Sequence, residues 1–152
     1  YDVNKIIRIG TCGSNKIDVK VGDIVLADAS YSESSFGEVI KPGISKVIEA
    51  SKGLTDKIFQ TGINNNLNIK RGTIYTSDVF DVYFDISRIT NNKDLLVSEM
   101  EAYGLFFIAN YLNKEAATIL TVVDSKYENE IISPENREKA LNEMIKLALD
   151  SI

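Results

Sequence analysis

An arginine interrupts an apolar segment near the start of the chain. Residues 5–10 read Lys-Ile-Ile-Arg-Ile-Gly, a β-branched run closed by glycine that predicts a buried strand. Burying an unpaired guanidinium is very costly, so Arg8 is expected to meet an anion. From residue types alone, a salt bridge to an internal carboxylate is the more common arrangement. The alternative is a phosphate contact, completed by the Thr11 hydroxyl and the backbone amides of a small-residue turn at 11–14.

Two carboxylates flank Met100 at the start of an apolar segment, 102–112, that predicts a largely buried helix. Glu99 and Glu101 would then lie at a helix N-terminus, where carboxylates commonly act only as partners of the helix dipole. The functional alternative is that one of them accepts hydrogen bonds from vicinal sugar hydroxyls. Both interpretations stay open on this pattern alone.

A third carboxylate, Asp124, follows the apolar run 116–123, which predicts the last strand. Open α/β sheets bind ligands at the carboxyl ends of their strands, although an aspartate there can equally cap a turn. Ser133-Pro134 then predicts the start of a helix, with serine as the N-cap and proline at the first position. Arg137 lies in the first turns of that helix, where a cation is slightly unfavourable, so a partner such as Asp124 is expected. Phe80 follows Ser77-Asp78, and a phenylalanine is more often a core residue than a ligand platform.

The composition excludes several classes of protein. Among 152 residues there is no histidine, so no Ser-His-Asp or Cys-His nucleophile can form within this chain. The net charge of −5 argues against a nucleic-acid partner, which would require a basic face. No apolar run is long enough to cross a membrane. A lone Cys12 forms no intramolecular disulfide or cysteine-rich metal site, which is typical of a cytoplasmic protein.

The remaining segments alternate between expected strands and helices, and no internal repeat or second domain is evident. This alternation predicts one α/β domain, over residues 1–152, with a sheet covered by helices on both faces. The expected strands are 5–10, 24–27, 69–76 and 116–123, and the expected helices are 45–60, 102–112 and an amphipathic one from 134 to the end.

The order and spacing of these motifs resemble the hexameric, bacterial-type purine nucleoside phosphorylases. The similar segments are 8–13 (Arg-Ile-Gly-Thr-Cys-Gly), 77–80 (Ser-Asp-Val-Phe), 99–102 (Glu-Met-Glu-Ala), 122–124 (Val-Val-Asp) followed by Arg137, and the closing 142–149. The resemblance covers nearly the whole chain, although Glu-Met-Glu alone also marks the wider superfamily of phosphorylases and nucleosidases. It implies a three-layer α/β/α fold with a partly closed mixed sheet, assembled as a trimer of dimers.

The resemblance also implies a role for each candidate residue. Arg8 and Thr11 are similar to the family's phosphate ligands, and Glu99, Met100 and Glu101 to its ribose-binding group. Asp124, assisted by Arg137, would protonate or hydrogen-bond purine N7. The base would lie among Cys12, Gly13, Ser77, Phe80 and Ser98. The implied ligands are a purine nucleoside and inorganic phosphate as co-substrate, with no metal or other cofactor.

The chemistry of such an enzyme requires these residue types. Cleaving the glycosidic bond builds positive charge on the ribose and negative charge on the departing purine. A phosphate dianion stabilises the first and then captures it, while a proton delivered to N7 neutralises the second. Asp124 must therefore be protonated at the working pH, and burial would raise its pKa in that direction.

The sequence departs from the family at three places. Val123 stands where the family usually has serine, and Ser125 where it usually has histidine, so the preference for the base is open. The family's N-terminal region, which supplies a glycine-rich phosphate loop, is missing. We therefore expect the chain to be a segment of a longer protein, with other polypeptide covering the strand 5–9.

Three rival functions remain. A nucleosidase of the same superfamily uses water in place of phosphate, but that class resembles Asn-Thr-Gly-Ser-Ala-Gly at the turn and has no need of Arg8. Uridine phosphorylase is similar around Arg8 but lacks an aspartate at the position of Asp124. A non-catalytic nucleoside-binding module would keep the fold without the phosphate loop.

Overall fold

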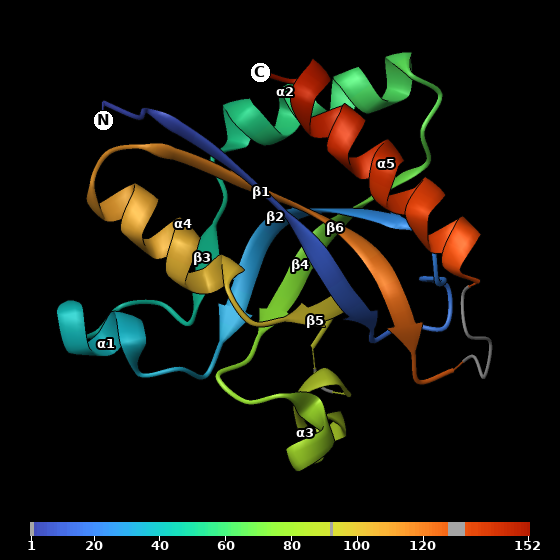
Figure 1. Ribbon diagram of the computed structural model, residues 1–152. Coiled ribbons are helices and arrows are strands. Elements are labelled where there is room, and N and C mark those ends of the chain that lie inside the picture. The colour runs from blue at the N-terminus through green and yellow to red at the C-terminus, as the bar shows by residue number, and fades with distance from the viewer. Residues whose placement is uncertain (1, 92, 128–132) are drawn as a thin grey trace.

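The computed structural model describes residues 2–91, 93–127 and 133–152, which form a mixed sheet with helices packed around it (Figure 1). The strands are β1 (Lys5–Ser14), β2 (Ile24–Ser32), β3 (Val47–Glu49), β4 (Ile69–Thr76), β5 (Val97–Glu99) and β6 (Glu115–Ser125). Their order is β3-β2-β4-β5-β1-β6, and β2 also pairs with β6. Five strands therefore close into a ring, and β3 extends it at β2. The expected partly closed mixed sheet is confirmed.

Helices cover the sheet on both faces. They are α1 (Phe36–Ile40), α2 (Lys52–Asn64), α3 (Ser87–Thr90), α4 (Ala102–Tyr111) and α5 (Pro134–Asp150), with a 3₁₀ turn, η1, at Asp81–Tyr83. The start of α5 follows the sequence prediction, because the Ser133 hydroxyl accepts a hydrogen bond from the Asn136 N–H at 3.2 Å and Pro134 opens the helix. None of the described helices is long and apolar enough to cross a membrane.

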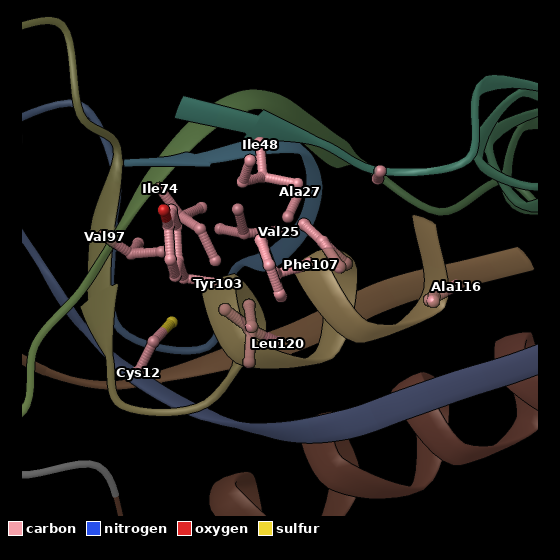
Figure 2. Packing of buried hydrophobic residues seen from close by; sticks show 14 of the residues in the cluster. Cys12, Val25, Ala27, Ile48, Ile74, Val97, Tyr103, Phe107, Ala116 and Leu120 are labelled. Atoms are coloured by element: carbon pink, nitrogen blue, oxygen red, sulfur yellow. The ribbon is translucent and has the colours of Figure 1, made fainter. Parts of the chain in front are cut away.

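Alternation along the strands builds two separate cores. Val25 of β2 and Leu120 of β6 pack with α4 in one cluster, which Figure 2 shows from close by. Leu26 and Ile119, their neighbours in sequence, pack with α2 and α5 in the other. Successive side chains of a strand point to opposite faces, so central strands covered by helices on both sides must be apolar throughout. These two cores are the physical basis of the three layers.

The expected helix at 45–60 is wrong in its first part. Val47 and Ile48 lie in β3, where Ile48 pairs with Ser30 of β2, and the helix begins only at Lys52. The apolar residues of 47–58 have the spacing of a helix. Val47 and Ile48 instead pair with β2 and extend the sheet. The expected turn at 11–14 also differs, because β1 continues to Ser14.

β1 is not the buried strand that its sequence predicts. Along its whole length it pairs with β6, but β5 joins its other edge only at Gly13 and Ser14. Among the described residues, the rest of that edge has no strand partner, and the side chains of Ile6 and Ile9 are exposed. An apolar run with a free edge is typical of a surface that pairs with further polypeptide.

Candidate functional site

A cavity of about 360 Å³ lies where β1, β5 and β6 end, and we call it the site cavity. The segment that follows β4 closes its remaining side. Among its lining residues are all the candidate site residues except Arg137: Arg8, Thr11, Cys12, Gly13, Ser77, Phe80, Ser98, Glu99, Met100, Glu101 and Asp124. Residues from four distant parts of the sequence thus meet around one space large enough for a small ligand.

Arg8 is held between carboxylates at one end of the site cavity. Its Nη1 lies 3.3 Å from Oε2 of Glu99, and its Nη2 pairs with Glu101. The guanidinium packs over Gly10, since a Cβ on that glycine would lie 2.9–3.1 Å from its atoms. The internal salt bridge expected from residue types is therefore present. Nη1 is buried and makes no hydrogen bond within the described residues, although the Glu99 carboxylate lies beside it.

Glu99 has a side chain only 1% exposed and is surrounded by hydrogen-bond donors. Thr76 donates its hydroxyl hydrogen bond to the carboxylate, and the backbone N–H groups of Glu101 and Ala102 donate at 2.9 and 3.0 Å. Burial raises the pKa of Glu99, while these hydrogen bonds and Arg8 act against the rise. Glu99 therefore caps the N-terminus of α4, as expected of a carboxylate partner of the helix dipole.

Glu101 is placed differently from Glu99 although it is only two residues away. Its side chain is 59% exposed, and its carboxylate contacts Arg8 from the open side of the site cavity. Met100 is also exposed beside it. Of the two carboxylates, Glu101 is the one with oxygen atoms free to accept further hydrogen bonds from a ligand.

Asp124 lies next to the last residue of β6 and lines the same cavity. Among the described residues, nothing donates a hydrogen bond to its carboxyl group and no cation pairs with it. Asp124 is exposed to solvent as a residue, but partial burial of its carboxyl group raises its pKa, as does the negative charge of Asp81, while Lys126 acts in the opposite direction. A carboxyl group with a raised pKa and no donor near it can hold a proton, which is the state that a general acid needs.

The base-side candidates form the wall between these two ends. Phe80 is 54% exposed and lines the cavity, so it is not one of the core residues. Ser98 is oriented by Asn15, whose Nδ2 donates to its hydroxyl at 2.8 Å. Burial, together with Asp124 and Glu99, raises the pKa of the Cys12 thiol, which therefore stays neutral.

Arg137 is the candidate that the structure does not bring to the cavity. It lies exposed in the first turns of α5, and no ion pair joins it to Asp124 in the part of the chain that the structure describes. A strand residue is placed by the register of the sheet, whereas the position of Arg137 depends on the connection between β6 and α5.

Sequence reasoning missed two residues that tune the site. Thr76 ends β4 and orients Glu99, and Asp81 acts on the pKa of Asp124. Thr76 ends a predicted strand, which is a signal that could have been used, whereas nothing local marks Asp81. Within 2–91, 93–127 and 133–152, no group of three or more acidic or cysteine side chains has the arrangement of a metal site.

Comparison with known proteins identifies a family that this chain matches. Residues 1–152 match the family model described as the phosphorylase superfamily. The chain is 32% identical to the purine nucleoside phosphorylase DeoD-type of Oceanobacillus iheyensis, an alignment that covers 100% of this chain and 66% of that protein. It is 35% identical to the proteins of the same name from Mycoplasma genitalium and Brevibacillus brevis, over 99% of this chain and 64% and 65% of theirs. The chain thus spans slightly less than two thirds of the length of these relatives.

Proposed function

The chain belongs to the phosphorylase superfamily, and we propose that it carries the nucleoside-binding part of a purine nucleoside phosphorylase. The reaction is the reversible phosphorolysis of purine ribonucleosides and deoxyribonucleosides to the free base and the pentose 1-phosphate. Inorganic phosphate is the co-substrate, and no other cofactor is needed. The observation that supports this most directly is that Arg8 and Asp124 line the same cavity, where Arg8 offers a cation for an anion and Asp124 a carboxyl group whose pKa is raised.

Asp124 acts on the leaving base in this proposal. As the bond between N9 of the purine and C1′ of the ribose breaks, its electron pair moves into the purine ring. A proton from the Asp124 carboxyl group neutralises that charge at N7, and a phosphate oxygen forms the new bond to C1′. Partial burial and the charge of Asp81 raise the pKa of Asp124, which is the direction that a proton donor requires.

The ribose is bound by the residues at the start of α4. Glu101 has exposed carboxylate oxygens that can accept hydrogen bonds from the vicinal hydroxyls, and Met100 packs beside the sugar. Glu99 completes this group by fixing the backbone from which Glu101 projects. The hydrogen bonds to Glu99 make it a support for the ribose site, and Glu101 is its direct contact.

Phosphate is bound by Arg8 and Thr11. Both line the site cavity, and the guanidinium already has the Glu101 carboxylate as its anion on the open side. A phosphate dianion would compete with Glu101 for Arg8, which would leave Glu101 available to the ribose hydroxyls. The two ligand sites are therefore adjacent and share one ion pair.

The base lies on Phe80 and is surrounded by Cys12, Gly13, Ser77 and Ser98. Because Asp124 faces this pocket, both 6-aminopurine and 6-oxopurine nucleosides are expected substrates. Val123 also lines the cavity, and its apolar side chain offers the base no hydrogen bond. The role proposed for Arg137, assisting proton transfer, requires the start of α5 to move toward Asp124.

Further polypeptide is part of this proposal. The exposed Ile9 of β1 lines a groove of about 400 Å³, formed mainly by apolar residues of β1, α2 and α5, that additional chain would cover. The resemblance to the family accounts for it by an N-terminal part that completes the phosphate site, within a cytoplasmic hexamer. We propose that arrangement for the whole protein.

The deciding experiment measures the release of hypoxanthine from inosine by the full-length protein, with and without phosphate. Release that depends on phosphate and yields ribose 1-phosphate supports the proposal. Release of equal rate without phosphate indicates a nucleosidase, and tight inosine binding without turnover indicates a binding module. Uridine as the better substrate would place the protein with the uridine phosphorylases.

A further inference from the structure

β1 and β6 change register beside Asp124. Cys12 pairs with Val122, and the next pair along the two strands is Gly13 with Asp124. Val123 has no partner on β1 and is therefore the extra residue of a β-bulge, a feature that often re-aims a side chain beside an active site. Side chains alternate along a regular strand, yet Val123 and Asp124 both line the site cavity. The bulge is what turns the carboxyl group of Asp124 toward the cavity.

The glycine opposite this bulge is not required by its own backbone. Positive-φ glycines occur at Gly22 and Gly43, and Gly13 is not one of them. An alanine could therefore adopt the backbone conformation of Gly13 without strain. The requirement for glycine must therefore come from the atoms that a side chain at position 13 would contact.

A side chain at Gly13 would meet the carboxyl group of Asp124. The three heavy atoms nearest to a Cβ built there all belong to that group: Cγ at 3.4 Å, Oδ2 at 3.8 Å and Oδ1 well inside contact distance. The Asp124 carboxyl group thus occupies the space that the Cβ of any other residue at position 13 would need. The clash would be relieved by rotation of the short Asp124 side chain, because no backbone atom stands in the way.

We infer that Gly13 is a positioning residue for Asp124. Because Gly13 has no side chain, it leaves the space beside the bulge in which the Asp124 carboxyl group lies. The inference rests on the proposed phosphorolysis for the role of Asp124 as the proton donor to the base. In an alanine variant the carboxyl group must leave this position and is displaced from the base. The reaction then loses its general acid although Asp124 is still present in the chain.

A double-mutant cycle in the full-length protein tests this. Gly13→Ala is expected to lower kcat for adenosine by roughly tenfold to a hundredfold, within the range of a displaced general acid. In an Asp124→Ala background the same substitution should change kcat less than about twofold, because residues that act as one unit are not additive. Equal losses in both backgrounds would mean that the added methyl group obstructs the base itself, and would overturn the inference.

A matched control tests whether the effect is specific to position 13 or follows from replacing any glycine with alanine. Gly53 lies exposed in α2, and a Cβ there has no atom within 4 Å, so Gly53→Ala should leave turnover unchanged. If Gly13→Ala fails to fold, the double variant Gly13→Ala/Asp124→Ala decides the cause. It folds when the overlap is with Asp124, and its failure to fold would contradict the inference.

A second measurement does not depend on activity. The carboxyl ¹³C resonance of Asp124 reports its pKa, which should be lower in Gly13→Ala than in the wild type because the carboxyl group loses the partial burial that raises it. An unchanged pKa would overturn the inference even if turnover falls. A wild-type protein without phosphorolysis would refute the proposed function, and this titration would still decide where the carboxyl group stands.

Discussion

Glu99 and Asp124 both line the site cavity, and burial raises the pKa of both carboxyl groups, yet their surroundings are opposite. Glu99 accepts three hydrogen bonds and lies beside a guanidinium, and these contacts act against the rise that burial causes in its pKa. Asp124 has no donor among the described residues, and its nearest charged influence, Asp81, favours the protonated form. In the proposed function the same side-chain chemistry would serve structure at the end of β5 and proton transfer at the end of β6.

The largest expected effect is on stability, at Glu99. Glu99→Ala removes the cap of α4 and leaves the Thr76 hydroxyl and Arg8 without their buried partner, which should lower the free energy of unfolding by about 3 kcal/mol. Asp124→Ala should cost less than about 0.5 kcal/mol, because no partner is lost. Urea unfolding of both variants measures the difference. Similar losses in the two would remove the distinction between the carboxylates.

The next effect is on turnover, at Asp124. Asp124→Asn keeps the shape of the side chain but cannot donate a carboxyl proton, so phosphorolysis of adenosine should fall by on the order of a hundredfold or more. Initial rates at saturating phosphate provide the measurement, and a thermal melt of the variant provides the control. Unchanged adenosine turnover would exclude Asp124 as the general acid.

Arg8 tests whether the cation beside Glu99 also serves a ligand. Arg8→Ala should raise the Kd for phosphate by roughly tenfold to a hundredfold, the equivalent of one charge-assisted hydrogen bond, and affect nucleoside binding much less. The matched control is Arg71→Ala, which loses ion pairs to Asp28 and Asp56 away from the site cavity. A purely structural role predicts that both variants lose stability and neither loses phosphate affinity selectively.

The smallest effect is a shift of the pH profile. Activity requires protonated Asp124, so kcat/KM falls as pH rises through its pKa. Asp81→Asn removes the nearby negative charge that raises this pKa, and the alkaline limb should therefore move to lower pH by a fraction of a unit. Asp85→Asn is the control, since Asp85 does not line the cavity. A shift to higher pH in Asp81→Asn would contradict the assignment.

The sequence by itself determined most of the strands and the identity of the candidate residues. Apolar runs at 24–27 and 116–123 became parts of β2 and β6, because strands covered on both faces need apolar side chains, and the strand expected at 69–76 became β4. Ser133-Pro134 located the start of α5 through local capping, which acts within one turn of helix. The resemblance to a family then identified the candidate site residues, and all of them except Arg137 line one cavity.

Only the tertiary structure decided how these residues meet. The pairing of Arg8 with Glu101 joins positions 93 residues apart, and the bulge at Val123 arises from the register between two strands. A tertiary contact also decided that Val47 and Ile48 form the strand β3 and not the first turn of α2. They pair with β2, although their spacing fits a helix. Local sequence patterns report the preference of a segment for a helix or a strand. Register, bulges and buried ion pairs depend instead on contacts between segments that are distant along the chain.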